Sequence, residues 1–455
     1  MMKFLRSPKL LRAAMFYVIA SISFALFAAL SVGAQTTKQA AIGDYERQSG
    51  REMLRAVKAD IEKYYYDASY HGIDIEARFK EAEEKIKKAT SNGQIYGIIA
   101  QILLDFDDSH LAFLPPRRAA KVEYGWQMQI IGERCYVIAV KPGSDAEAKG
   151  LKPGDKVISV DGYEPTRDIL WKMQYSYYSL RPRPGMRVIA QSPGGEPRQL
   201  DVLAKITDGK KVIDFLQGNQ SDANDYFREL DNEARLDRHR FSEFGDELIV
   251  WKMPGFNLYD EKDVDEIMSK VKKHKALILD LRGNGGGYVV MLKRLLGYFF
   301  DKDIKIADVK YRKKVEEEIA KTRGTGGFKG KIIVLVDSRS GSAAEMFARV
   351  IQLEKRGIVL GDRSAGAVMQ SVVYGHTVGM ESIVPYGVNI TNADVIMTDG
   401  KSLEKTGVTP DEVMLPTATE MATNRDPVLA RAAELLGFKL DAEKAGALFP
   451  IEWTK

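Results

Sequence analysis

Apolar residues recur at helical spacing over residues 40–106 of the chain. Two stripes carry this pattern, the first on Leu54, Val57, Ile61 and Tyr64, the second on Ile95, Ile98, Ile99, Ile102, Leu103 and Phe106. Asn92-Gly93 separates the stripes, and Pro115-Pro116 excludes helix beyond the second one. The pattern predicts an amino-terminal helical region over 35–118.

Short strands separated by turns follow over residues 119–206. The expected strands are 136–140, 156–160, 188–191 and 199–203, with helices at 145–149 and 166–179. This order, with the run Gly-Leu-Lys-Pro-Gly-Asp-Lys-Val-Ile-Ser-Val-Asp-Gly at 150–162, resembles a PDZ domain. The resemblance implies a small β-sandwich or barrel that binds extended carboxyl-terminal segments by strand addition.

A change to an α/β pattern occurs at residue 245, after a polar, charge-rich stretch at 207–244 that we interpret as a linker. Apolar runs of strand length at 248–251, 276–280, 332–336 and 358–360 alternate with helical stretches at 260–273, 288–300 and 342–353. Such alternation predicts a mixed or parallel sheet with helices packed on it, over 245–418. A helical tail is expected at 419–455.

The amino terminus has the pattern of an export signal. Residues 1–12 carry four basic residues and no acid, residues 13–34 carry no charge, and the run ends in Val32-Gly33-Ala34. We expect residues 1–34 to be a cleaved signal peptide or, because 13–34 is long, a membrane anchor. Without the four basic residues the chain has 63 basic and 63 acidic residues, so nucleic acid is not an expected partner.

Cysteine chemistry and metal binding are not indicated. Cys135 is the single cysteine, and its neighbours predict a strand, so we interpret it as a buried structural thiol. No Cys/His cluster has the spacing of a metal site, and no cofactor is expected.

The sharpest local signal is a strand at 332–336 followed by Ser338, Ser340, Gly341 and Ser342 at the start of a helix. A serine at a helix start lies beside free backbone N–H groups and the positive end of the helix dipole, which suits a nucleophile with an oxyanion site. Ser342 with Glu345 also matches a capping box, which is a purely structural alternative. Ser338 and Ser340 are secondary candidates that precede the helix.

A second signal is Leu-Asp-Leu-Arg-Gly-Asn-Gly-Gly-Gly at 279–287, a strand that ends in a glycine-rich turn. Glycines allow close approach of backbone N–H groups to a ligand, although such a turn by itself is usually structural. Leu-Asp-Leu-Arg-x-Asn-x-Gly-Gly followed by Gly-Ser-Ala-Ala-Glu at 341–345 resembles the tail-specific, carboxy-terminal processing serine peptidases. Residues 361–366 and 401–411 are similar to later motifs of that family, which implies a crotonase-like α/β core that cleaves peptide bonds.

The sequence differs from many members of that family at the position of the catalytic base. Many members of the family use a serine–lysine pair, but the matching position is Ala367, and no lysine occurs between Arg356 and Lys401. Either the protein is inactive or it resembles the tricorn-like branch, which uses histidine. The residues that match that branch are Ser109, His110, Ser342 and Glu404.

This resemblance implies that His110 activates Ser342, while Glu404 orients the imidazole through Ser109. The oxyanion donors are expected to be the N–H groups of Ala343 and Gly286, with Gly285 as an alternative to Gly286. His110 can instead be a helix-end residue that caps carbonyl groups. Among the other histidines, His376 is the alternative base, whereas His71, His239 and His274 are expected at the surface.

The expected function is that of a serine endopeptidase acting in the periplasm or outside the cell. Its partners would be proteins or peptides with exposed carboxyl-terminal tails, with membrane contact only through an uncleaved leader. The likeness to PDZ domains points to a carboxylate-binding loop at Tyr124, Gly125, Trp126 and Gln127. Two alternatives are an inactive PDZ scaffold and a carrier of small apolar ligands. The oligomeric state does not follow from the sequence.

Overall fold

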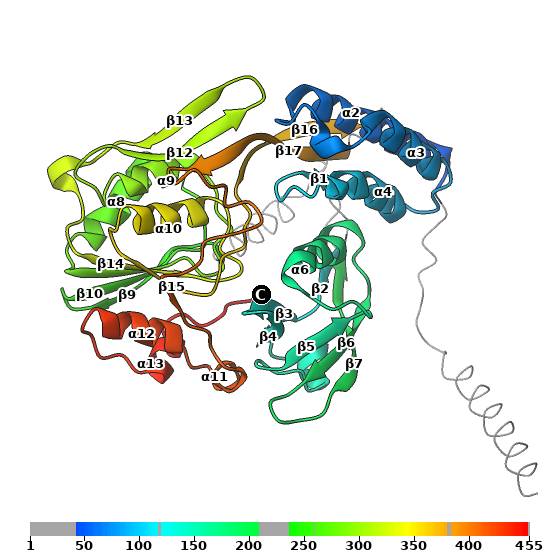
Figure 1. Ribbon diagram of the computed structural model, residues 1–455. Helices are drawn as coiled ribbons and strands as arrows, with labels where there is room; N and C mark the ends of the chain where they lie inside the picture. Colours follow the sequence, from blue (N-terminus) through cyan, green and yellow to red (C-terminus); the bar gives the residue numbers. More distant parts are fainter. Residues whose placement is uncertain (1–41, 117–119, 209–235, 259, 380–383, 454–455) are drawn as a thin grey trace, which may run out of the picture. The chain divides into compact units, whose positions relative to one another are not determined.

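The computed structural model describes residues 42–453 except 117–119, 209–235, 259 and 380–383 (Figure 1). The expected leader at 1–34 lies outside these residues. Residues 44–455 form one compact unit. No helix among the described residues has both the length and the apolar character needed to span a bilayer.

Three helices form the amino-terminal region, as predicted: α2 (Asp44–Tyr64), α3 (Ile75–Lys87) and α4 (Asn92–Asp105). Side chains at their starts accept backbone N–H groups, Asp74 for α3 and Ser91 for α4. Beyond α4 the chain forms a short strand, β1 (Ala112–Leu114), which pairs antiparallel with β17 (Val384–Met397) of the core. This pairing ties the segment after α4 to the core sheet.

The PDZ region contains a five-stranded antiparallel sheet in the order β3-β4-β5-β6-β7. Its strands are β3 (Trp126–Ile131), β4 (Arg134–Val140), β5 (Lys156–Val160), β6 (Gly185–Gln191) and β7 (Arg198–Leu203). Its helices are α5 (Asp145–Ala148) and α6 (Arg167–Gln174), the latter followed by a π-helical turn to Leu180. Cys135 is buried in this core, and burial raises the pKa of its thiol to about 12, which fits a structural thiol.

The predicted linker at 207–244 needs correction at both ends. β8 (Lys205–Asp208) pairs with β2 (Ala120–Glu123) and therefore belongs with the PDZ region. β9 (Arg240–Phe244) pairs antiparallel with β10 and is the edge strand of the core sheet. The sequence of β9 lacks the apolar pattern of a buried strand because several of its side chains are polar, and an edge strand does not need to be apolar on both faces.

The core contains the predicted α/β sheet, in the order β18-β15-β14-β11-β10-β9. Its other strands are β10 (Leu248–Lys252), β11 (Ala276–Asp280), β14 (Lys331–Val336), β15 (Ile358–Gly361) and β18 (Glu412–Val413). All neighbours except β9 and β10 run parallel. The multidomain α/β fold class is therefore confirmed.

The core contains a second sheet that the sequence pattern does not predict. It consists of β1, β12 (Ile304–Tyr311), β13 (Val315–Ala320), β16 (Met369–Val378) and β17. Most residues of β13 and β16 are half-buried or exposed, and their polar positions lowered their apparent strand character. β16 matters for the site, because it follows directly after the loop at 362–368.

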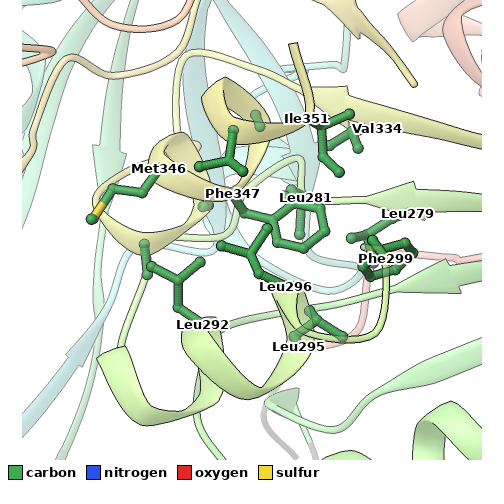
Figure 2. Close-up of a cluster of buried hydrophobic side chains, with 14 of the residues drawn as sticks. Leu279, Leu281, Leu292, Leu295, Leu296, Phe299, Val334, Met346, Phe347 and Ile351 are labelled. Carbon is green, nitrogen blue, oxygen red and sulfur yellow. The ribbon is translucent and has the colours of Figure 1, made fainter. Parts of the chain in front are cut away.

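Helices cover both faces of the parallel sheet (Figure 1). One face packs against α8 (Glu261–Val271), α9 (Val289–Leu296) and α10 (Ala343–Leu353). Figure 2 shows Phe347 and Ile351 of α10 facing the leucines of α9 and the strand residues Leu279 and Val334. The other face packs against α12 (Pro427–Leu435) and α13 (Ala442–Ala447), which α11 (Ala418–Ala422) precedes. The expected carboxyl-terminal tail is thus helical, and it is also part of the core.

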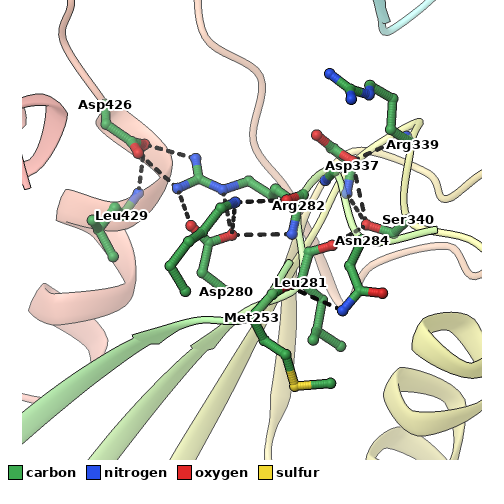
Figure 3. A network of polar contacts seen from close by, with 12 residues as sticks. Met253, Asp280, Leu281, Arg282, Asn284, Asp337, Arg339, Ser340, Asp426 and Leu429 are labelled. Carbon is green, nitrogen blue, oxygen red and sulfur yellow. Dashed lines mark hydrogen bonds and ion pairs between the residues drawn. The ribbon is translucent and has the colours of Figure 1, made fainter. Parts of the chain in front are cut away.

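An ion-pair network joins this carboxyl-terminal segment to the end of β11 (Figure 3). Arg282 donates to Asp280 through Nε and Nη2, and its Nη1 and Nη2 donate to Asp426 at 3.0 and 2.7 Å. Asp426 also accepts the N–H of Leu429 at 2.9 Å, as the cap of α12. Asp280 is 1% exposed, and the cations beside it hold the pKa of its carboxyl well below the usual range despite burial.

We expect Asp426→Ala to lower the free energy of unfolding by about 3 kcal/mol, because it removes a helix cap and one carboxylate partner of Arg282. Urea denaturation followed by circular dichroism measures this. Asp441→Ala is the matched control, since Asp441 caps α13 through the N–H of Lys444 without an arginine partner. Equal losses from the two variants would contradict a special role for the network.

Candidate active site

Ser342 stands at the junction between β14 and α10, in a strained backbone conformation. Its φ of 53° and ψ of −120° are rare for a residue with a side chain. The N–H of Ser342 donates to Glu345 Oε2 at 3.0 Å and to the carbonyl of Ala367 at 2.8 Å. Ser342 and Glu345 thus form the predicted capping box at the start of α10.

The two alternative serines have structural partners. Ser340 is 0% exposed, and its hydroxyl donates to the carbonyl of Leu281 at 2.8 Å. The hydroxyl of Ser338 donates to the carbonyl of Ile130 in the PDZ region. Both hydroxyls shape the turn before Ser342, which makes them poor candidates for a nucleophile.

His110, Ser109 and Glu404 form a hydrogen-bonded chain, although Glu404 lies far away in the sequence. The hydroxyl of Ser109 donates to Glu404 Oε2 at 2.8 Å and lies 2.8 Å from His110 Nδ1. The N–H of Ser109 donates to Glu404 Oε1 at 3.1 Å. A hydroxyl has one proton, so Ser109 accepts from Nδ1–H while it donates to the carboxylate. The proton of the neutral imidazole is therefore on Nδ1, and Nε2 carries the lone pair that a base requires.

Burial controls the titration of this chain. Desolvation lowers the pKa of His110, partly opposed by the charge of Asp108. Desolvation also raises the pKa of Glu404, although Ser109 and the N–H of Val368 stabilise its charge. His110 is consequently neutral at pH values where an exposed histidine is still protonated.

One peptide group connects this chain to Ser342. The carbonyl of Ala367 accepts the N–H of Ser342, and the N–H on the other side of the same peptide bond, that of Val368, donates to Glu404 Oε2 at 2.9 Å. Ser342, Glu404, Ser109 and His110 are thus linked through four hydrogen bonds. Ala367, where the serine–lysine branch has its lysine, lies in this connecting peptide and has no side-chain base to offer.

The oxyanion expectation needs a correction at Gly286. The N–H of Gly286 donates to Asn284 Oδ1 at 2.9 Å and is not free. Gly286 nevertheless lies against the nucleophile: a Cβ added to it would come within 2.6 Å of Ser342 Cβ and 2.9 Å of the Ala343 nitrogen. Within the described part of the chain, the N–H groups of Ala343, Gly287 and Gly285, the predicted alternative, have no hydrogen-bond partner.

Comparisons with known proteins place these elements in a family. Residues 248–414 match peptidase family S41, and residues 120–170 match the PDZ domain. The core segment is thus similar to peptidase family S41. The matched segment contains Ser342, the glycine turn and Glu404.

Two relatives and one solved structure illustrate the match. The tail-specific protease of Haemophilus influenzae is 28% identical over 287 residues, which are 58% of this chain and 37% of that protein. The chloroplastic C-terminal processing peptidase of Tetradesmus obliquus is 24% identical over 374 residues, which are 78% of this chain and 75% of that protein. The crystal structure of mature CPAF has the same fold, with a TM-score of 0.61 at 14% identity, and the match covers 83% of this chain and 94% of that one.

The sequence predicts Glu345 only as a helix cap, yet it is central in this site. It is 0% exposed and accepts four hydrogen bonds, from the Ser364 hydroxyl (2.6 Å) and the N–H groups of Gly366 (2.8 Å), Ala367 (3.0 Å) and Ser342 (3.0 Å). Burial raises the pKa of its carboxyl to about 7. Only the ionised form can accept all four donors, because a protonated oxygen would face one of them with its own hydrogen.

The remaining histidines have other partners. His376, the alternative base, bonds to Asp60 at 2.6 Å and stacks on Tyr386. His274 was expected at the surface, but it is only 7% exposed, and Glu243 of β9 lies 3.3 Å from its Nε2. His71 is exposed, as predicted, and its Nδ1 lies 2.9 Å from the carbonyl of Phe106. His239 is half-buried, and its Nδ1 accepts from Trp251 Nε1.

The predicted carboxylate-binding loop has mostly buried side chains. Tyr124 and Trp126 are buried in the PDZ core, and the Tyr124 hydroxyl accepts the N–H of Arg183 at 3.0 Å. Gly125 has a φ of 72°, and its carbonyl accepts the N–H of Lys141. Tyr124 and Trp126 therefore build the loop, and a peptide would meet its backbone, the half-buried Gln127 and the edge of β3. Across the described ranges, no group of histidine, cysteine and acidic residues could hold a metal ion.

If the site hydrolyses peptides, we expect its kcat/KM to rise with pH along a limb centred near pH 7, because Glu345 has to be ionised while His110 is already neutral below its usual pKa. The carboxylate form exists above its pKa, so activity is lost as the pH falls through about 7. Initial rates at low substrate concentration between about pH 5 and 9 measure this limb. A profile that is flat down to about pH 5.5 would contradict the role of Glu345.

Proposed function

We propose that the protein is an exported serine endopeptidase that uses Ser342 as its nucleophile and His110 as its general base. The observation that carries this proposal is the continuous hydrogen-bond chain from the backbone of Ser342 through the 367–368 peptide and Glu404 to Ser109 and His110. A serine–lysine mechanism is disfavoured, because Ala367 occupies the position where that base would stand.

The proposed reaction is acyl transfer through the Ser342 hydroxyl. His110 Nε2 removes the hydroxyl proton as the oxygen attacks the carbonyl carbon of the scissile bond, and the same nitrogen then gives this proton to the departing amine. Glu404 stabilises the imidazolium through the Ser109 hydroxyl, since a negative charge near a positive ring lowers the cost of forming it. Water, activated by His110, hydrolyses the acyl-enzyme.

The oxyanion of the tetrahedral intermediate is assigned to the N–H of Ala343 at the start of α10. This N–H lies at the positive end of the helix dipole, which adds to the stabilisation. Because the Gly286 N–H is engaged by Asn284, the second donor is assigned to Gly287, which follows it in the same turn. Its φ of 137° requires glycine in any case.

The proposed substrates are proteins or peptides with exposed carboxyl-terminal tails. The printed names of the relatives, a tail-specific protease and a C-terminal processing peptidase, support this substrate class. Among the described strands, β3 pairs only with β4, so its other edge is the place where a tail can add as a further strand. The basic and apolar pattern of residues 1–34 supports export to the periplasm or the cell exterior.

Ser342→Ala and His110→Gln are each expected to lower kcat/KM by about 10⁴-fold, since the nucleophile and its base act as one unit. Hydrolysis of fluorescently labelled casein measures the loss, and fluorophosphonate labelling followed by peptide mapping identifies the reactive serine. His376→Gln is the matched control and should retain activity. Full turnover by Ser342→Ala would contradict the assignment of Ser342 as the nucleophile, whereas a wild type that binds tails without turnover would favour the inactive scaffold.

A peptide that ends in apolar residues with a free carboxylate is expected to bind at least about tenfold more tightly than the same peptide with an amidated end. The carboxylate would bond to backbone N–H groups at 124–127, whereas the amide adds a donor that faces them. Fluorescence anisotropy with the Ser342→Ala variant measures binding without cleavage. Equal affinities would contradict tail recognition by the PDZ domain.

A further inference from the structure

The PDZ domain touches the turn that presents Ser342. Ile130 is opposite Cys135 of β4, and its carbonyl accepts the Ser338 hydroxyl. The core thus occupies part of the free edge of β3, and the contact lies four residues before the nucleophile. This contact is independent of the predicted carboxylate-binding loop at the other end of β3.

Asp337 lies at the centre of this contact between the PDZ domain and the nucleophile turn. Its Oδ1 accepts the N–H groups of Gly283 at 2.9 Å and Arg339 at 3.0 Å, and Figure 3 shows the carboxylate between the glycine turn and the nucleophile turn. Its Oδ2 accepts the side-chain amide of Gln129 at 2.7 Å. Gln129 is only 8% exposed, although its neighbours Met128 and Ile130 point into the PDZ core. One carboxylate therefore joins the glycine turn, the nucleophile turn and the PDZ strand.

A second contact fixes the same end of the PDZ domain. Arg167, at the start of α6, donates to both oxygens of Asp362 at 2.8 Å and to the carbonyl of Gly132 at 2.8 Å. The N–H of Gly132 donates to Asp362 Oδ2 at 2.9 Å. Asp362 begins the loop in which Ala365 donates to the carbonyl of Ser340, so both loops around Ser342 contact the PDZ domain.

We infer that Gln129 and Asp337 form a positioning pair through which the docked PDZ domain holds Ser342 in its reactive conformation. The strained φ of Ser342 persists only if its surroundings determine it, and the turn at 337–341 is the segment that imposes it. The Gln129 amide stabilises and orients, by its hydrogen bond, the carboxylate that fixes this turn. The PDZ domain is thus part of the catalytic framework, in addition to any tail that it binds. The inference rests on the proposed role of Ser342.

A charge swap across this pair tests the inference in the full-length protein. In Gln129→Glu, two carboxylates face each other, and the nucleophile turn should lose its support. In Asp337→Asn, the side-chain oxygen still accepts the N–H groups of Gly283 and Arg339. The Gln129 side-chain amide can rotate by 180°, so that its oxygen accepts a hydrogen bond from the new amide group at position 337. In the double variant, the new amide at position 337 donates to the new carboxylate at position 129, so the pair is restored with its roles exchanged. Gln199→Glu is the matched control, because Gln199 is exposed on β7 at the opposite edge of the PDZ sheet.

The rate of fluorophosphonate labelling at a pH of about 8 reports directly on the reactivity of Ser342. We expect Gln129→Glu to be labelled at least about tenfold more slowly than the wild type, and the double variant to return to within about threefold of it. Gln199→Glu should stay close to the wild type. Gln129→Met, which removes the donor without adding charge, should slow labelling by about fivefold and serves if Gln129→Glu does not fold.

Three results separate the possible failures. Wild-type labelling of folded Gln129→Glu or Gln129→Met would overturn the inference. A double variant that stays as slow as Gln129→Glu would also overturn it, because the loss would then not arise from this pair. Labelling that persists in Ser342→Ala would instead refute the proposed nucleophile, whatever the Gln129 variants do.

Discussion

The site depends on one buried peptide group, that between residues 367 and 368. Its carbonyl accepts the N–H of Ser342, and its N–H donates to Glu404, which in turn holds Ser109 and His110. More than two hundred residues separate His110 from Ser342 in the sequence. Because a peptide group is planar and rigid, it transmits the position of one partner to the other with little freedom. The loop at 362–368 is therefore the structural link between the two halves of the site.

Two buried carboxylates set the electrostatics around this link. Glu345 fixes the loop and the nucleophile from one side with four accepted hydrogen bonds, and Glu404 fixes the loop and the histidine from the other. Burying a charge is costly unless it is hydrogen-bonded, and both carboxylates meet that condition with backbone N–H groups. This arrangement gives the site fixed dipoles before any substrate arrives, which is the main way in which enzymes stabilise developing charge.

The parallel strands of the core were predictable, because strands buried on both faces are continuously apolar, as 276–280 and 332–336 are. The second sheet was not, since most residues of β13 and β16 are half-buried or exposed, and the edge strand β9 of the first sheet was missed because it is largely polar. The motifs pointed to Ser342 and, through resemblance, to Ser109, His110 and Glu404. Residue type alone could not reveal that Asn284 occupies the Gly286 N–H or that Tyr124 and Trp126 are buried, because those facts depend on how distant segments pack.

The most direct test of the linkage is chemical rescue of His110→Ala by imidazole, followed by fluorophosphonate labelling of Ser342. The variant leaves a cavity beside Ser109 in which free imidazole can take the place of the missing ring. The account predicts slow labelling without imidazole and a saturable increase with its concentration, while Ser342→Ala stays unlabelled throughout. Labelling of His110→Ala at the wild-type rate in the absence of imidazole would contradict the account.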